Sequence, residues 1–405
     1  MIYSSIDIGS DTIKICVGKV TKNSIDILAS SKTHAVGIKK GLIVDKDLAM
    51  QSIILALNEI ESELGFRIDK AVITVPLYDV QVDIYNGCSY ADGEITGADV
   101  ITCFKSSVST IDVDKEVVTV FPIDFLIDDE VRVTDPIGMK GNKLESRMLI
   151  SIIPKENVYP YLDLLEKCNI EVIDLSFGVI NDFYHVKDND DYIKNSGIVV
   201  DIGNDKTEIA VFNKGLLVNG VVMPSGSKLL DHDISYIYHF DKTTSRKLKE
   251  NVAMASSQYA DELDTMECDN VEGEKITVNA LEVSQIVEAR LEELLKNVKK
   301  ILNDLTNREI SYIIMVGGVT NLPGFDYLMG NIFGEIATSI NISTIGVRNN
   351  VYTSCVGMLK YYYDKLRIRG IDYTMYTDIL KNIQDKKNIV QNKVLDDFKE
   401  YIENN

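Results

Sequence analysis

The tripeptide Asp-Ile-Gly occurs twice in the chain, at residues 7–9 and 201–203, and each copy lies between two apolar runs. Both surroundings predict a strand, a tight turn and a second strand. Glycine lets a backbone approach a ligand closely, successive turn amides can point at phosphate oxygens, and an Asp at the strand end can hold a hydrated cation. One copy is explained by turn chemistry alone. Two copies in matching surroundings predict a pair of hairpins that clasp a phosphorylated ligand from both sides.

A third segment has a related pattern. An apolar run at residues 311–316 leads into Gly317 and Gly318, and Pro323-Gly324 is a further turn signal. Such a loop lets a flat base or a ribose pass close to the main chain. In this order, the two hairpins and the Gly-Gly loop resemble the three-part pattern of the actin and heat-shock-chaperone ATPases. The resemblance implies an α/β fold of two lobes with duplicated ribonuclease-H-like cores.

Longer segments narrow the resemblance to the bacterial cell-division FtsA family. These segments are residues 36–65, 71–87, 120–154 and 283–302. The run from Asp135 to Glu145 is the most specific, because it belongs to the extra subdomain that FtsA proteins carry in place of the usual one. The resemblance covers roughly residues 1–363. It implies an actin-like two-lobed fold with an FtsA-type inserted subdomain.

The expected division of the chain follows breaks in its pattern together with the resemblance. Strand and helix signals alternate up to about residue 81, and short Asp-rich strands follow. We expect lobe 1 (subdomain 1A) at 1–81 and 161–195, the inserted subdomain (1C) at 82–160, lobe 2 (2A) at 196–230 and 301–351, subdomain 2B at 231–300, a helix closing lobe 1 at 352–365, a linker at 366–392 and a C-terminal amphipathic helix at 393–405.

Composition limits the classes of function. The net charge is −20, which disfavours broad contact with nucleic acid because phosphate binding needs clustered Lys and Arg. Six cysteines without a Cys-x-x-Cys pair indicate neither a zinc site nor a disulfide framework, and they fit buried thiols of a reducing cytoplasm. There is no basic-then-apolar leader and no run of ~18 apolar residues, so neither a signal peptide nor a membrane-spanning helix is expected.

The family resemblance implies bound ATP and Mg²⁺, with the ion held through water by Asp7 and Asp201. It assigns no catalytic residue in this chain. The other residues that correspond to the family's nucleotide contacts are Gly9, Ser10, Thr12, Gly203, Asn204, Lys206, Thr207, Gly226, Lys249, Gly317 and Gly318.

The second hairpin departs from the family pattern. Family members tend to have Asp-Ile-Gly-Gly-Gly-Thr-Thr-Asp, whereas this chain has Asn204, Asp205 and Lys206 after its glycine. The added Cβ atoms and the charge of Asp205 oppose phosphate contact, and Lys206 can offset that charge. Arg246 replaces the acid that would accept ribose hydroxyl protons, and no water-positioning residue is evident at residues 175–186. We expect ATP to bind more weakly than in relatives with complete glycine loops, and at most a weak ATPase.

The helix predicted at residues 281–305 has an apolar face and a charged face. Solvation and i,i+4 pairing are sufficient to explain its surface charges. The resemblance implies in addition that Arg290 and Glu293 receive the acidic and apolar C-terminal peptide of the tubulin-like protein FtsZ. The sequence leaves both interpretations open.

Near the end of the chain, five apolar residues with helical spacing form a stripe. They are Val394, Leu395, Phe398, Tyr401 and Ile402. FtsA proteins typically end in an amphipathic helix on the inner leaflet, which implies peripheral attachment to the cell membrane at the division site. Acidic neighbours outnumber lysines around the stripe, so its attraction to anionic lipid is poor. A helix that packs on a protein partner is the alternative.

The resulting hypothesis is an actin-like division protein that binds ATP, self-associates into filaments, tethers FtsZ filaments to the cytoplasmic membrane and contacts other division proteins. Two alternatives stay open. One is a nucleotide-cleft enzyme, either an ATPase or a sugar-kinase-type phosphotransferase. The other is a non-hydrolysing paralogue that keeps the fold only as a scaffold for protein contacts. A kinase needs a catalytic Asp in a substrate cleft, and the run from Asp135 to Glu145 favours the division protein.

Overall fold

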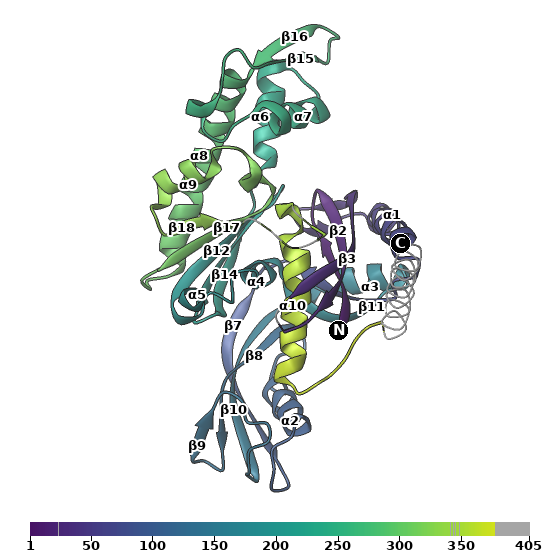
Figure 1. Cartoon of the computed structure of the whole chain (residues 1–405), viewed down its shortest axis with the longest axis vertical. Helices are drawn as coiled ribbons and strands as arrows, with labels where there is room; N and C mark the ends of the chain where they lie inside the picture. Colours follow the sequence, from purple (N-terminus) through teal and green to yellow (C-terminus); the bar gives the residue numbers. More distant parts are fainter. Residues whose placement is uncertain (23, 341, 343, 345, 348, 377–405) are drawn as a thin grey trace, which may run out of the picture.

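Two five-stranded sheets with the same strand plan form the body of the molecule (Figure 1). The computed structural model describes residues 1–376 except 23, 341, 343, 345 and 348. The sheet of lobe 1 has the order β11 (Glu171–Phe177), β6 (Lys70–Val75), β1 (Ile2–Ile8), β2 (Thr12–Val20) and β3 (Ile25–His34). The sheet of lobe 2 has the order β18 (Ala337–Ser339), β17 (Tyr312–Val316), β12 (Ser196–Ile202), β13 (Thr207–Asn213) and β14 (Leu216–Met223).

The strand pairing confirms the duplicated cores. In lobe 1, β1 is antiparallel to β2 and parallel to β6, and in lobe 2, β12 is antiparallel to β13 and parallel to β17. The central strands are short β-branched or aromatic runs, and β17 is buried along its whole length. Such runs form strands because branched side chains pack well on a pleated surface that is covered on both faces.

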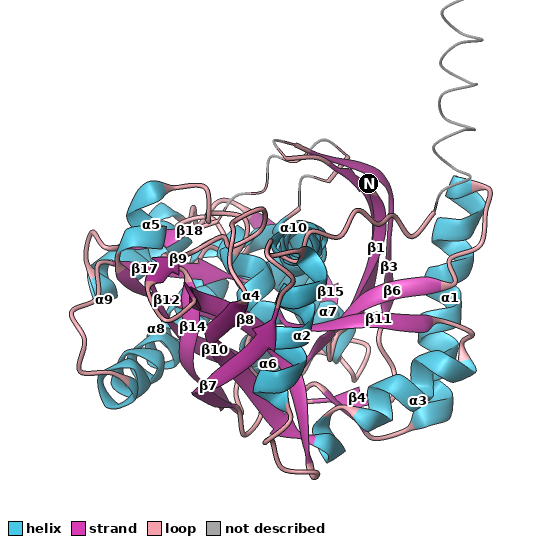
Figure 2. Ribbon diagram, turned by 90° about the horizontal axis from the view of Figure 1, so that it is seen from below, coloured by secondary structure: helices cyan, strands magenta, loops and turns pink. Residues whose placement is uncertain are grey.

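Helices cover both faces of the lobe 1 sheet. Figure 2 shows α1 (Lys46–Leu64) and α3 (Tyr159–Lys167) on the outer face, and α4 (Gly178–Phe183) and α10 (Thr353–Ile368) on the side toward lobe 2. Helix α1 begins where the Asp45 side chain accepts from the amides of the first turn, and it ends at Gly65 in the left-handed conformation. A two-stranded ribbon, β4 (Ile38–Lys39) with β5 (Leu42–Ile43), precedes it.

Helices α4 and α10 cross at very short range. An added Cβ at Gly357 of α10 would lie 1.8 Å from the carbonyl oxygen of Asn181 in α4, so only glycine fits at this crossing. The side chain of Asn181 is buried, accepts from the Ser176 hydroxyl at 2.7 Å and donates to Ser354 Oγ at 3.3 Å. The crossing therefore fixes the end of α4 and the start of α10 relative to each other.

A separate four-stranded sheet lies below the two lobes in Figure 1. Its order is β7 (Gln81–Tyr90), β10 (Lys143–Pro154), β8 (Lys115–Ile127) and β9 (Val131–Val133), and α2 (Gly97–Val108) packs on it. The rings of Phe104 and Phe125 stack with centroids 6.5 Å apart in its own small core. This unit occupies the region in which the inserted subdomain is expected.

A second outgrowth extends lobe 2 at the top of Figure 1. It contains α6 (Lys228–Tyr238), α7 (Lys242–Val252), the hairpin of β15 (Thr265–Asp269) and β16 (Lys275–Asn279), and the first turns of α8 (Ala280–Leu305). The helix predicted at 281–305 is thus present, one residue longer at its start. Helix α9 (Phe325–Phe333) and the short helix α5 (Asp190–Lys194) complete lobe 2.

The last described residues pack back on lobe 1. Met375 donates its amide to the Ile2 carbonyl at 3.0 Å, and the Tyr376 hydroxyl donates to the Lys70 carbonyl at 2.8 Å. The predicted linker at 366–392 therefore starts with the end of α10 and this packed segment. Among the described residues, no helix is both long and apolar enough to cross a bilayer. The predicted C-terminal helix at 393–405 lies outside the described residues.

The α4–α10 crossing leads to a stability prediction. We expect Gly357→Ala to lower the free energy of unfolding by about 2 kcal/mol or more, because the added methyl meets a backbone carbonyl that cannot move alone. Gly330→Ala in α9 is the matched control, since its added Cβ meets no atom within 4 Å and better helix propensity adds up to about 1 kcal/mol. Urea denaturation of both variants measures the difference, and equal midpoints would contradict the proposed crowding.

Candidate functional site

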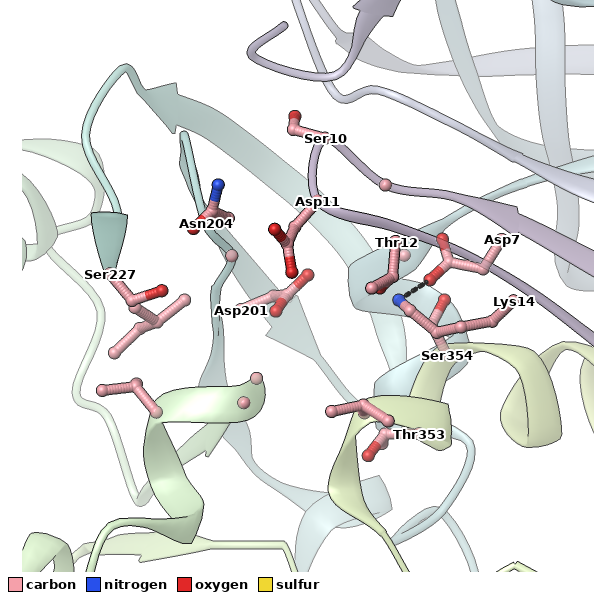
Figure 3. Close-up of a pocket in the computed structure, with 18 of the residues that line it drawn as sticks. Asp7, Ser10, Asp11, Thr12, Lys14, Asp201, Asn204, Ser227, Thr353 and Ser354 are labelled. Carbon is pink, nitrogen blue, oxygen red and sulfur yellow. Dashed lines mark hydrogen bonds and ion pairs between the residues drawn. The ribbon is translucent and has the colours of Figure 1, made fainter. Parts of the chain in front are cut away.

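The turns of the two Asp-Ile-Gly hairpins have the same hydrogen bond. Gly9 donates its amide to the Thr12 carbonyl at 3.1 Å, and Gly203 donates its amide to the Lys206 carbonyl at 3.0 Å. An added Cβ at Gly9 would lie 2.8 Å from the Thr12 oxygen, so the tight turn needs glycine there. Both turns face one cavity of about 590 Å³ between the lobes. Figure 3 shows side chains from both hairpins and from the start of α10 directed into this space.

Most of the predicted nucleotide contacts line this cavity. Those that do are Asp7, Gly9, Ser10, Thr12, Asp201, Gly203, Asn204, Lys206, Lys249, Gly317 and Gly318. Two others support the second turn from behind. Thr207 is buried and donates its hydroxyl to the Ser225 carbonyl at 2.8 Å. Gly226 packs so closely on the second turn that an added Cβ would lie 2.4 Å from the Gly203 carbonyl oxygen.

The Gly-Gly loop after β17 packs closely on the second hairpin. Gly317 has a φ of 108°, and its added Cβ would lie 2.2 Å from the Ile202 carbonyl oxygen. Both observations require glycine at this position. The backbone of the loop therefore meets the end of β12, and Gly318 opens on the cavity beside Asn321 and Pro323.

Lys14 is a site residue that the sequence reasoning missed. It lies directly opposite Asp7 in the β1–β2 register, and its Nζ is 2.5 Å from Asp7 Oδ2, as the dashed line in Figure 3 marks. Thr74 donates its hydroxyl to the other Asp7 oxygen at 2.8 Å. Burial alone raises the pKa of Asp7, but Lys14 and Thr74 together hold that pKa below its ordinary value. The hairpin register of the first Asp-Ile-Gly copy was the signal that could have identified Lys14.

The second hairpin has the opposite charge at the equivalent position. Glu208 lies opposite Asp201, just as Lys14 lies opposite Asp7. Glu208 is buried, accepts the Leu77 amide of lobe 1 at 3.0 Å and pairs with the Lys206 ammonium. Burial, then the negative charges of Glu208 and Asp7, raise the pKa of Asp201 to about 6. The Asp201 carboxyl therefore releases its proton near neutral pH.

Asp182 at the end of α4 lines the floor of the cavity. Its Oδ2 is buried and has no hydrogen-bond partner among the described residues. Burial, then the charges of Asp201 and Asp7, raise the pKa of Asp182 well above its ordinary value. The segment 175–186, in which the sequence offers no evident group for positioning water, thus contributes a carboxyl to the cavity. Sequence spacing does not indicate it, because α4 comes from outside both hairpins.

The Asp205 carboxylate was expected to lie near phosphate, but Asp205 does not line the cavity. The Asp205 carboxylate lies 3.0 Å from Lys228 Nζ and accepts the Lys40 amide at 3.3 Å. Lys206 does not offset it, because its ammonium pairs with Glu208. The expectation that Lys206 offsets Asp205 was therefore wrong, because Lys228 pairs with Asp205 and Lys206 pairs with Glu208.

Two cations from α7 reach the cavity from lobe 2. Lys249 Nζ lies 2.6 Å from Asp231 Oδ1, and the pair is almost fully buried. Arg246 lies 3.5 Å from the other Asp231 oxygen and 2.8 Å from Asp11 in the first hairpin turn. Arg246 and Lys249 thus place two cations at this corner of the cavity.

Four of the acids that line the cavity lie close enough to interact. They are Asp7, Asp182, Asp201 and Glu208, and Lys14 and Lys206 are the ammonium groups paired with this set. Oxygen donors of this kind suit Mg²⁺, which keeps several of its waters. No three carboxylate, imidazole or thiolate groups of the described residues are close enough together to hold a metal directly. The residues present fit a hydrated cation that accompanies phosphate.

A second hollow lies on the lobe 2 outgrowth, between α6 and α8. It has a volume of about 560 Å³ and is lined by Asp233, Tyr236, Ile237, Tyr238, Glu282, Gln285, Ile286, Ala289, Arg290 and Glu293. Arg290 makes two hydrogen bonds with Asp233, at 2.6 and 3.2 Å, and one with Glu293 at 2.7 Å. Tyr236 and Ile237 are exposed beside this cluster. The hollow thus combines an apolar wall with one fixed guanidinium.

The raised pKa of Asp201 predicts how stability depends on pH. A carboxyl whose folded pKa of about 6 exceeds its ordinary 3.8 stabilises the fold below pH 4, and this contribution is lost as pH rises through 6. Without Mg²⁺, the unfolding free energy of Asp201→Asn relative to the parent protein should rise by about 2 kcal/mol between pH 4 and pH 7. Asp7→Asn should change in the opposite direction and mainly below pH 4, because the pKa of Asp7 is lowered from 3.8. Urea denaturation in a chelator measures both, and a pH-independent difference for Asp201→Asn would refute this assignment.

Comparison with known proteins agrees with this architecture. The sequence model described as "Cell division protein FtsA" matches residues 198–357, and the one described as "SHS2 domain inserted in FTSA" matches residues 79–152. The cell division protein FtsA of Bacillus subtilis is 28% identical over 391 residues, which cover 94% of this chain and 88% of that protein. FtsA of Staphylococcus epidermidis is 26% identical over 365 residues, covering 88% of this chain and 78% of that protein.

Solved structures share the fold at low sequence identity. The PilM-PilN type IV pilus biogenesis complex has a TM-score of 0.58 and 12% identity, covering 89% of this chain and 98% of that one. MreB5 of Spiroplasma citri bound to ADP has a TM-score of 0.57 and 9% identity, covering 91% of this chain and 98% of that one. The two lobes, the inserted sheet and the matched sequence together lead to one conclusion. The chain belongs to the FtsA family of actin-like cell-division proteins.

Proposed function

We propose that this protein binds ATP with Mg²⁺ between its lobes and links FtsZ filaments to the cytoplasmic membrane at the division site. The observation that carries the nucleotide part is the pair of matching hairpin turns, with Asp7 and Asp201 at the ends of their strands, on opposite sides of one cavity. Turn amides bind phosphate, and the two carboxylates suit a hydrated cation. The related fold of MreB5 has been solved with ADP and with AMPPNP, which supports nucleotide as the ligand class.

Several features favour binding that is weaker than in relatives with complete glycine loops. Asn204 places a side chain in the second turn where a glycine would let phosphate approach. The Ser10 hydroxyl already accepts the Gly41 amide at 2.7 Å. Lys206 is paired with Glu208, so phosphate has to compete for its charge. Lys14 is held by Asp7, and it can still direct its remaining ammonium hydrogens into the cavity. A weak ATPase, or binding without turnover, fits these contacts.

The hollow between α6 and α8 is the proposed site for the FtsZ C-terminal peptide. Its exposed Tyr236 and Ile237 suit apolar anchors, and Arg290 suits a peptide carboxylate. The contact between Arg290 and Glu293 brings together the two residues that the family resemblance assigns to the peptide. Asp233 holds Arg290 in place from α6, so the guanidinium is oriented before any peptide arrives.

Filament formation and membrane attachment complete the proposal. The expected division into subdomains 1A, 1C, 2A and 2B is compatible with self-association into filaments, as in other actin-like proteins. The residues proposed for membrane contact, Val394, Leu395, Phe398, Tyr401 and Ile402, lie outside the described residues. Other division proteins are proposed as further partners on the strength of family membership alone.

Calorimetric titration tests the nucleotide site. We expect ATP to bind at millimolar or lower concentration with Mg²⁺ and more weakly in a chelator, because the two strand-end carboxylates hold the hydrated ion. Asp201→Asn should remove most of the Mg²⁺ dependence, whereas Asp188→Asn, which changes an exposed carboxylate paired with Lys360, should not. A folded parent protein that gives no heat with millimolar MgATP would favour the non-hydrolysing scaffold.

Fluorescence anisotropy with a labelled FtsZ C-terminal peptide tests the second hollow. Replacing Arg290 and Glu293 with Ala should weaken binding roughly tenfold or more, because few anchors carry such a contact. The matched control is Glu292→Ala with Lys296→Ala, which removes a charge pair of the same kind, 3.0 Å apart, on the same helix but outside the hollow. If both double variants bind the peptide like the parent protein, the recognition surface lies elsewhere.

A further inference from the structure

Three polar contacts join the two lobes across the cavity. At the floor, the Leu77 amide of lobe 1 donates to Glu208 of lobe 2 at 3.0 Å. Beside the second turn, the Lys40 amide donates to Asp205 at 3.3 Å. At the third level, Arg246 of α7 lies 2.8 Å from Asp11 in the turn of the first hairpin. Only this third contact joins two charged side chains that both line the cavity.

The Arg246 contact depends on a cation at this position. An acid at position 246 would stand against the carboxylate of Asp11 and repel it. The guanidinium attracts Asp11 instead and also lies within 3.5 Å of Asp231, which fixes its direction from its own lobe. Asp231 in turn is paired with Lys249, so this corner is a connected network of two cations and two carboxylates.

We propose that Arg246 is a clasp, because its ion pair with Asp11 holds the two lobes together across the cavity. The ion pair with Asp11 takes over the closing contact that a nucleotide would otherwise supply by touching both lobes. The clasp itself does not depend on a ligand. Its consequence for ATP rests on the proposed function: entry of the nucleotide requires Arg246 to release Asp11, so Arg246 lowers the affinity for ATP.

The strength of the clasp follows from its exposure. The Arg246 and Asp11 side chains are 32% and 27% exposed, so water screens part of their attraction. A pair of this kind shifts an equilibrium by about fivefold rather than by orders of magnitude. That is strong enough to favour the closed arrangement and weak enough for a ligand to displace.

Hydrogen exchange of the ligand-free protein tests the clasp directly. The amides of Leu77 and Lys40 donate across the cavity, so they exchange when the lobes open. In Arg246→Gln their exchange should be faster by about fivefold. The Ile68 amide donates to Glu61 within lobe 1 and should exchange at the parental rate. Lys247→Gln, which removes an exposed charge from the adjacent position of α7, should leave all three amides unchanged.

Removing the other partner of the ion pair provides the second test. Asp11→Asn should also speed exchange at Leu77 and Lys40, and adding Arg246→Gln to it should give no further increase, because both changes break the same contact. Parental rates in Arg246→Gln, or additive effects of the two changes, would overturn the clasp. Titration with ATP tests the clasp and the nucleotide site separately. With Mg²⁺, ATP should bind Arg246→Gln about fivefold more tightly than the parent protein. If ATP binds neither protein while the exchange difference persists, the clasp stands and the nucleotide assignment fails.

Discussion

The crossing of α4 and α10 is the contact on which the arrangement of the cavity depends. Gly357 has no side chain, so the backbone of α10 reaches the carbonyl of Asn181. One core then continues from the lobe 1 sheet through these helices to strands of lobe 2, including Val199, Phe212 and Ile314. The lobes are therefore joined by packed apolar residues at the base of the cavity and by polar contacts above it. Motion between them is confined to the polar side, because close-packed cores resist deformation.

The same crossing brings polar side chains from different segments to the cavity. Asp182 lies near the end of α4 and Ser354 near the start of α10. Asp7 and Asp201, nearly two hundred residues apart in the sequence, come from the two sheets. Burying several carboxylates together is unfavourable unless cations or protons compensate. Lys14 and Lys206 compensate part of this charge, and the pKa values of Asp182 and Asp201 are raised because both groups are buried near other carboxylates. A bound cation would lower the free-energy cost of ionising both groups.

Local patterns predicted the parts of the site that are made of backbone. Each Asp-Ile-Gly copy and the Gly317-Gly318 loop were recognisable because tight turns and close approaches require glycine whatever the rest of the fold does. The duplicated sheets followed from the same repeats. Lys14, Asp182 and Glu208 were not recognised, because their place in the cavity depends on strand register and on a helix packed from a third segment. The contact between Arg246 and Asp11 joins residues far apart in sequence, and no spacing rule could indicate it.

The way in which the last described residues return to lobe 1 has a mechanical consequence. Thr374 and Met375 are hydrogen-bonded to Ile2 at the start of β1, and Tyr376 is bonded to Lys70 at the start of β6. A pull on the chain beyond Tyr376 is therefore carried first by the two neighbouring central strands of lobe 1. The load enters at the starts of these strands, whereas the first Asp-Ile-Gly turn lies at the other end of β1. Tension on the chain would therefore reach the body without separating the lobes.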